Sequence, residues 1–171
     1  VSGLVAEHFA NHAQTSVFET AFHIDDTEIR YCHGTGMGAR IQTNNYVHHM
    51  GQMGGGGGNG GLVEGNVFAC NNNLGYSQGW ECGGAKYVTG PAGVTVRNNV
   101  FQSNFGPGIW TDVDSVNVIY ESNTVLNNSG SGIFHEISFG AIIRDNVVAG
   151  NCIEYSVPGP WGNGPNYGAY C

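Results

Sequence analysis

The stretch GPGIWTDVDSVNVIYESNTVLNNSGSGIFHEIS, residues 106–138, carries one pattern twice. NFGPGIWTDV from Asn104 returns 24 residues later as NSGSGIFHEI from Asn128, so Trp110 matches Phe134 and Asp112 matches Glu136. A fixed period in the twenties is typical of a solenoid, whose units stack because none of them can bury its apolar face alone. The repeat therefore predicts a chain wound into stacked coils.

Shorter segments extend this period along the chain. NVFACN begins at residue 66, NVFQSN at 99, NTVLNN at 123 and NVVAGN at 146, with a weaker relative, NYVHHM, at 45, so the steps are 21, 33, 24 and 23 residues. Three strands of ~4–6 residues and three turns need about this much chain. The sequence thus predicts an all-β fold, a single-stranded right-handed parallel β-helix of about five to six rungs. The longest step is an ordinary rung with a loop insertion.

Equivalent positions of stacked rungs form columns, because parallel strands bring them ~4.8 Å apart. Two columns are apolar and are predicted to point inward: Val47, Phe68, Phe101, Val125 and Val148, and then Val63, Val96, Tyr120 and Ile143. One column alternates in charge and is predicted to be a surface ladder: Glu64, Arg97, Glu121 and Arg144. The leading asparagines, and Asn71, Asn104, Asn128 and Asn151 five positions later, are predicted to form amide ladders at turns.

Composition and charge limit the kinds of fold and of partner that are expected for this chain. The 171 residues are predicted to form one β-helix domain, either complete or part of a longer chain, with the clearest repeats at 39–151 and a Gly/Pro-rich tail at 152–171. The 29 glycines and 11% charged residues suit many turns and few helices. A net charge of −8 with five Lys and Arg argues against nucleic acid as a partner, and no apolar stretch is long enough to span a membrane. The run of glycines from Gly54 is interpreted as a spacer loop.

Five cysteines favour an oxidising, extracellular compartment. Cys70 and Cys82 bracket the loop insertion, while Cys152 and Cys171 bracket the tail, so we expect these two disulfides and a free Cys32. Asn127 begins an Asn-Asn-Ser acceptor pattern for N-glycosylation. His48 and His49 are adjacent, and on a strand they would point to opposite faces, so we expect no shared metal site.

The repeated aromatic and acid form the candidate site. Ile109 and Ile133 are expected to point inward, so strand alternation sends Trp110 with Asp112, and Phe134 with Glu136, to the outside. Exposed rings can stack on a sugar's C–H face, and carboxylates can bind its hydroxyls or transfer protons. The same face is predicted to receive one cation and further loop residues. The substrate-binding candidates are Trp80, Glu81, Trp110, Phe134 and His135, and the catalytic candidates are Lys86, Asp112 and Glu136.

Several chemistries fit this set. In a hydrolase, Asp112 and Glu136 on adjacent rungs would lie ~5 Å apart, near the spacing of a retaining pair. In a lyase or epimerase, Lys86 would abstract a proton beside a uronate carboxylate, with Ca²⁺ neutralising that carboxylate. The acidic net charge slightly favours hydrolysis or simple binding of a polysaccharide. The alternative is a structural role, in which subunits with unpaired strand edges associate end to end into an extracellular fibre or adhesin.

The segments GWECGGAKYV, the 106–138 stretch and GAIIRDNVV resemble the right-handed parallel β-helix repeat proteins of the pectate-lyase-like superfamily, especially secreted microbial members with carbohydrate-related roles. The resemblance covers residues 39–151. It implies a three-sheet coil with a groove on one sheet, where lyases, glycosidases and epimerases act. This chain departs from the family's known enzymes, because it has neither a pectate-lyase WiDH-type segment nor the polygalacturonase NTD, DD and HG set.

Overall fold

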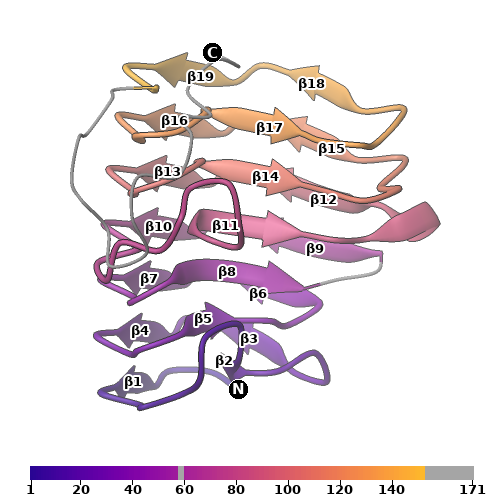
Figure 1. The fold of residues 1–171 in the computed structure, drawn as a ribbon. Helices are drawn as coiled ribbons and strands as arrows, with labels where there is room; N and C mark the ends of the chain where they lie inside the picture. Colours follow the sequence, from indigo (N-terminus) through magenta and orange to yellow (C-terminus); the bar gives the residue numbers. More distant parts are fainter. Residues whose placement is uncertain (58–59, 153–171) are drawn as a thin grey trace.

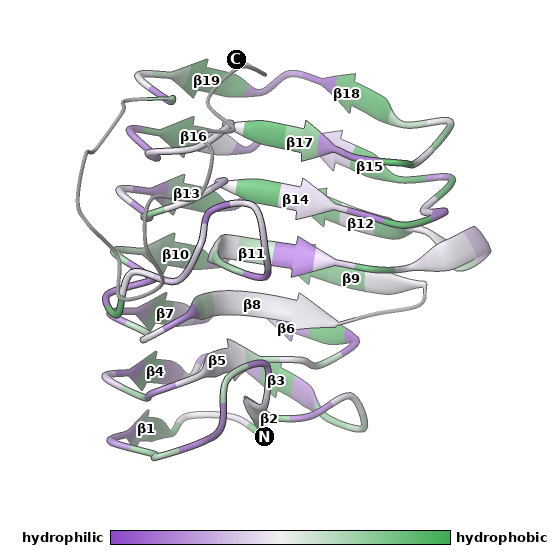
Figure 2. Cartoon of the chain, in the orientation of Figure 1, coloured by the Kyte–Doolittle hydropathy of each residue, from purple (hydrophilic) through white to green (hydrophobic). Residues whose placement is uncertain are grey.

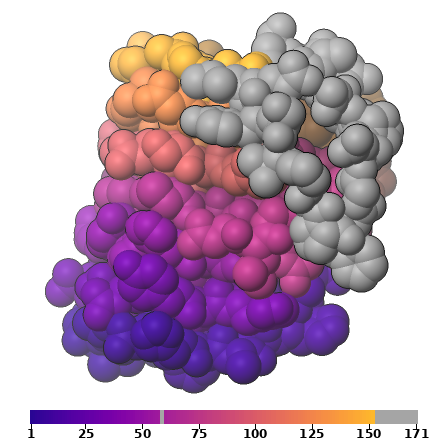
Figure 3. All heavy atoms as spheres, turned by 60° about the vertical axis from the view of Figure 1, so that its left-hand side comes forward, coloured from indigo at the N-terminus to yellow at the C-terminus, as the bar shows by residue number. Residues whose placement is uncertain are grey.

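The computed structural model describes residues 1–57 and 60–152 as a stack of coils, each with three short strands (Figure 1). Every strand pairs in parallel with the equivalent strand of the next coil, which confirms the predicted right-handed parallel β-helix. The only helical element in these residues is the short 3-10 turn η1, Gly90–Ala92, and no helix there is long and apolar enough to cross a membrane. The bands of colour remain stacked when the molecule is turned (Figure 3).

Three parallel sheets form the sides of the coil. Sheet 1 contains β1 (Val5–Glu7), β4 (Glu28–Arg30), β7 (Tyr46–His48), β10 (Val67–Ala69), β13 (Val100–Gln102), β16 (Thr124–Leu126) and β19 (Val147–Ala149). Sheet 2 contains β2 (Ser16–Phe18), β5 (Thr35–Met37), β8 (Met53–Gly57), β11 (Gly83–Tyr87), β14 (Ile109–Thr111) and β17 (Ile133–His135). Sheet 3 contains β3 (His23–Asp25), β6 (Ile41–Thr43), β9 (Gly61–Glu64), β12 (Val94–Arg97), β15 (Ile119–Glu121) and β18 (Ile142–Arg144).

The inward columns hold the core together. Phe68 and Phe101 are fully buried and their rings stack at 4.8 Å, with Val47 and Val125 in register on either side. The second column is buried from Val63 to Tyr120. At the last rung the predicted columns end in exposed residues, since Ile143 and Val148 are 57% and 49% exposed. Strands β10, β13, β16 and β19 are accordingly coloured as hydrophobic in Figure 2.

Both predicted asparagine ladders are present. In the first, the backbone N–H and side-chain amide of Asn66 both donate to Asn99 Oδ1, at 2.9 and 3.0 Å, and Asn99 repeats this pattern on Asn123. In the second, Asn71 donates to Asn104 and Asn104 to Asn128 in the same way. These side chains are buried, so each satisfies backbone groups that the turns would otherwise leave without partners.

The charge ladder is also present on the outer face of sheet 3. Arg97 pairs with Glu64 at 2.9 Å, and Arg144 pairs with Glu121 at 2.8 Å. All four side chains are partly exposed, so solvent screens each pair and its contribution to stability is small. This column is therefore structural.

Two expectations are wrong. Gly54–Gly57 form no spacer loop, because they are most of the strand β8, which is pale along its length in Figure 2. The predicted Cys70–Cys82 disulfide is absent, and both thiols are free, as is that of Cys32. Cys82 is fully buried and its sulfur lies against Gly106 of the next rung, whereas Cys70 sits in a left-handed turn after β10. The predicted Cys152–Cys171 bridge and the tail beyond residue 152 involve residues outside the described ranges.

Candidate functional site

The register of sheet 2 brings the repeated aromatic residues together. Lys86 of β11, Trp110 of β14 and Phe134 of β17 occupy one outward column on three neighbouring rungs. The Trp110 and Phe134 rings stack at 5.3 Å, and Lys86 Nζ lies 3.8 Å from the centre of the Trp110 ring. The alternation predicted from the sequence is therefore right, and the column combines a cation with two rings.

The carboxylates gather around Lys86. Lys86 Nζ lies 2.8 Å from Asp112 and 3.1 Å from Glu81, while Trp110 Nε1 donates to Glu136 at 3.1 Å. Asp112 and Glu136 directly follow β14 and β17, and the Glu136 N–H donates to the carbonyl of Thr111. We call Glu81, Lys86, Trp110, Asp112, Phe134 and Glu136 the ionic cluster.

Burial differs from the expectation of an exposed stacking surface. Trp110 is only 2% exposed and Asp112 only 8%, and both Lys86 Nζ and the Phe134 ring lie against the Trp110 ring. Trp80 is 49% exposed on the β10–β11 loop. His135 is on the inward side of β17, where its Nδ1 lies 2.7 Å from the Thr111 hydroxyl and 3.2 Å from that of Tyr120. His135 is therefore separated by the sheet from the ionic cluster.

Burial and neighbouring charged groups shift the pKa values of Lys86 and Glu136. Burial by itself lowers the pKa of Lys86, but the hydrogen bond to Asp112 and the charge of Glu81 outweigh it, so the pKa lies above its usual value. Burial and the neighbouring Asp112 raise the pKa of Glu136 against the opposing hydrogen bond from Trp110. The cluster therefore favours a cationic Lys86 and shifts Glu136 toward its protonated form.

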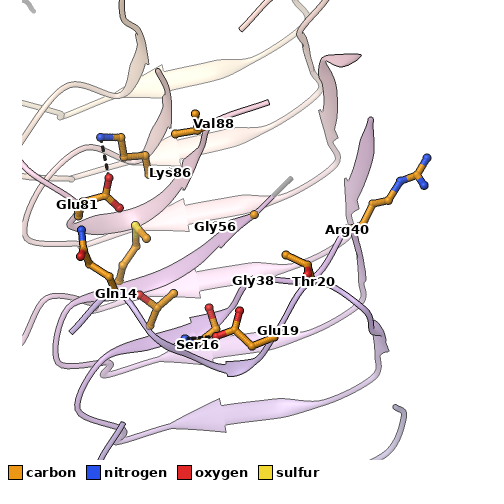
Figure 4. Close-up of a pocket in the computed structure, with 13 residues that line it drawn as sticks. Gln14, Ser16, Glu19, Thr20, Gly38, Arg40, Gly56, Glu81, Lys86 and Val88 are labelled. Carbon is orange, nitrogen blue, oxygen red and sulfur yellow. Dashed lines mark hydrogen bonds and ion pairs between the residues drawn. The ribbon is translucent and has the colours of Figure 1, made fainter. Parts of the chain in front are cut away.

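A groove of about 630 Å³ begins beside the cluster and runs over sheet 2 toward the N-terminal rungs (Figure 4). Its floor contains Gly38, just after β5, and Gly56 of β8, which lies opposite Lys86. A Cβ on Gly56 would come within 2.9 Å of the Lys86 carbonyl oxygen. The hollow exists because glycine supplies no side chain where later rungs carry Lys86, Trp110 and Phe134.

Most residues that line the groove have polar or charged side chains, and Met53 and Val88 add apolar surface. Gln14, Ser16, Glu19, Thr20 and Arg40 line it on the N-terminal side, and Glu81 and Lys86 close its other end. The sequence reasoning missed the N-terminal residues because the asparagine repeat is absent before residue 45. The signal that could have located the groove is the sequence MGGGG at 53–57, since a strand of glycines leaves a sheet face bare.

The ionic cluster does not fit a Ca²⁺ site. Two of its carboxylates, Glu81 and Asp112, pair with the Lys86 ammonium, which lies where a metal ion would have to bind between them. Across residues 1–57 and 60–152, no group of three or more His, Cys, Asp or Glu side chains is arranged to hold a metal ion. The Asn127 acceptor pattern is on an exposed left-handed turn after β16 of sheet 1, whereas the outward column of the cluster is on sheet 2, and its glycosylation stays a prediction.

Comparison with known proteins gives one match. Residues 11–170 match the family model described as the right-handed beta helix region. No curated protein and no solved structure is significantly similar to the chain.

Proposed function

Because the chain belongs to the right-handed β-helix family, we propose that it uses one face of its coil to bind a polysaccharide outside the cell. The observation that carries this proposal is the groove over Gly38 and Gly56, open along the face of sheet 2 and lined by polar side chains. A flat floor admits a sugar ring close to the backbone, while hydroxyl, amide and charged groups on the walls can bind its hydroxyls. An extracellular location is part of this proposal.

The charges on the walls favour a neutral or weakly charged glycan. Glu19 and Glu81 oppose one another along the groove, and Lys86 is already paired with two carboxylates. Arg40 extends away to one side in Figure 4 and donates to the carbonyl of Gly60. A uronate polymer would therefore meet little unpaired positive charge, and repulsion would weaken its binding.

The binding experiment compares neutral and uronate polysaccharides by affinity electrophoresis. Thr20 is exposed at the wall, so Thr20→Trp should fill the groove without disturbing the core and weaken binding by about tenfold or more. Thr95→Trp on sheet 3 is the matched control and should bind normally. Equal binding by both variants would place the glycan elsewhere. If light scattering shows that the protein forms polymers, and these do not bind glycan, the fibre alternative would be favoured.

A second activity, hydrolysis of the bound glycan, is supported by the pair Glu136 and Asp112. The raised pKa of Glu136 suits a general acid, while Asp112, 2.8 Å from Lys86 Nζ, is the second carboxylate of the pair. Because Asp112 is 8% exposed, the reaction requires the sugar to reach the edge of the cluster at Glu136. The raised pKa of Lys86 argues against a lyase that uses it as the base.

Hydrolysis is tested separately from binding by measuring released reducing ends. Glu136→Gln and Asp112→Asn should each lower the rate by about 100-fold or more while the glycan still binds. Glu64→Gln, a carboxylate of the charge ladder on sheet 3, is the control and should keep full activity. Tight binding without any product in the unsubstituted protein would remove the hydrolysis proposal and leave the binding proposal intact.

A further inference from the structure

A column of rings occupies one corner of the first three rungs. One residue after each strand of sheet 1 has a left-handed backbone, and in the later rungs this residue is Cys70, Ser103, Asn127 or Gly150. In the first three rungs it is His8, Tyr31 or His49, with φ of 59°, 52° and 54°. A bulky residue in this conformation costs roughly 1–2 kcal/mol. The turn itself does not require these rings, so they suggest another role.

Tyr31 contacts both His8 and His49, and the three rings form one side of a pocket. His8 stacks on Tyr31 with centroids 5.8 Å apart, and Tyr31 lies 5.2 Å from His49. The pocket has a volume of about 390 Å³, and Phe9, His33 and Leu74 complete its aromatic and apolar lining. Phe9 is 51% exposed and Leu74 is 47% exposed. We call this hollow the corner pocket.

The corner pocket differs chemically from the groove on sheet 2. Among the described residues that line it, none is Asp, Glu, Lys or Arg, and Asn73 is the one side-chain amide. A sugar ring presents several hydroxyls and needs several polar partners, which the groove has and this pocket lacks. A flat ring with a single polar substituent therefore fits the lining better.

A chain of hydrogen bonds controls the imidazole of His49. Glu28 Oε1 lies 3.0 Å from His48 Nε2, and His48 Nδ1 lies 2.7 Å from His49 Nδ1. His48 is 6% exposed and is held under the Tyr46 ring at 4.1 Å. The two histidines therefore face each other, contrary to the expectation of opposite strand faces, because the left-handed turn at His49 swings its ring back.

The hydrogen bonds from Glu28 through His48 select one tautomer of His49. The hydrogen bond from His48 lowers the pKa of Glu28, with Arg30 adding to the effect against burial, so Glu28 is an ionised acceptor. When both imidazoles are uncharged, His48 carries its proton on Nε2 toward Glu28 and accepts at Nδ1, so His49 donates from its own Nδ1. Burial lowers the pKa of His49, which favours its neutral form. Nε2 of His49, for which no described residue is a hydrogen-bond partner, is left as an acceptor.

We propose that the corner pocket binds a phenolic ring, which packs against Tyr31, Phe9 and Leu74 and donates its hydroxyl hydrogen bond to His49 Nε2. Glu28 and His48 are positioning residues, because they act on the ligand only through the tautomer of His49. This site is separate from the polysaccharide groove and does not depend on it.

The test uses phenol as the probe, with anisole lacking the O–H group and methyl β-glucoside lacking the aromatic ring. At about pH 8, where free imidazoles are neutral, phenol should shift the NMR signals of Tyr31 and His49 and bind about tenfold more tightly than anisole. His49→Asn keeps a residue that tolerates the left-handed turn and should abolish this preference. Cys70→Asn changes the same column one rung later, outside the pocket, and should retain it.

The positioning role of Glu28 and His48 predicts a separate change in the NMR spectrum. Glu28→Gln should move the ¹⁵N chemical shift of His49 Nε2 toward the protonated value and reduce the preference for phenol over anisole. Equal binding of phenol and anisole would overturn the hydrogen bond to His49, and preferential binding of methyl β-glucoside would overturn the phenolic ligand. No shift at Tyr31 or His49 with millimolar phenol would overturn the site.

Discussion

Single residues of the ionic cluster differ in what their charge does. Glu136 is raised in pKa mainly by burial and then by Asp112, whereas Lys86 is kept cationic by two carboxylates. The folded state therefore disfavours the charged form of Glu136 and favours the charged form of Lys86. Substitution of each should therefore have opposite effects on stability.

Glu136→Gln should leave the protein at least as stable as the unsubstituted protein at about pH 7.5 and lose that advantage near pH 4. A carboxyl whose pKa is raised on folding favours the folded state when protonated, and this contribution is lost as the pH rises through the folded pKa. Gln keeps an acceptor for the Trp110 N–H. Urea unfolding at both pH values measures the change, and a variant that is less stable only at pH 7.5 would contradict the raised pKa.

Lys86→Met should destabilise the fold by about 3 kcal/mol, because it leaves Asp112 and Glu81 without their counter-ion in a mostly buried site. Arg144→Met removes a pair of similar length on the exposed charge ladder and should cost less than about 1 kcal/mol. Chemical denaturation of the two variants gives the comparison. Equal losses would mean that the cluster is as well solvated as the ladder.

At the scale of elements, the turns are specified more strictly than the strands. Most strands have only three residues, too few to be stable alone, while the asparagine at each turn bonds the coil before it and the coil after it. Each ladder therefore links successive rungs in addition to the sheets.

Asn99→Ala should cost about 3 kcal/mol, since it leaves the N–H and side-chain amide of Asn66 buried without their acceptor and also frees the Val63 carbonyl. The neighbouring Asn98 is exposed with φ of 56°, so Asn98→Gly should cost less than about 1 kcal/mol. Thermal and urea unfolding can compare the two. A small effect at Asn99 would show that water replaces the ladder.

At the scale of the whole molecule, stability depends on position along the stack, because each rung contacts only its neighbours. Phe101 and Val148 belong to the same inward column, yet Phe101 is fully buried and Val148 is 49% exposed. The same column position is thus a core site in the middle and a surface site at the last described rung.

Phe101→Ala should destabilise the protein by about 3–5 kcal/mol through the cavity that it leaves against Phe68. Val148→Ala should cost less than about 1 kcal/mol. Hydrogen exchange should show the same gradient, with the amides of β18 and β19 exchanging before those of β12 and β13. Uniform exchange along the coil would contradict it.

The sequence by itself determined the coil. The apolar columns, the charge ladder and both asparagine ladders recur with each rung, and a parallel stack converts a repeat in sequence directly into neighbours in space. It also placed Lys86, Trp110 and Phe134 in one outward column. The register of stacked rungs needs no information from outside the repeat, which is why these predictions are confirmed.

Only the tertiary structure decided which groups each outward residue contacts. It buried Trp110 between Lys86 and Phe134, left Cys70 and Cys82 as free thiols, and joined Gly38 and Gly56 into the floor of a groove. It also turned His49 back onto His48. Burial, loop paths and hydrogen-bond partners depend on residues from several rungs and on non-repeating turns, so no single period in the sequence encodes them.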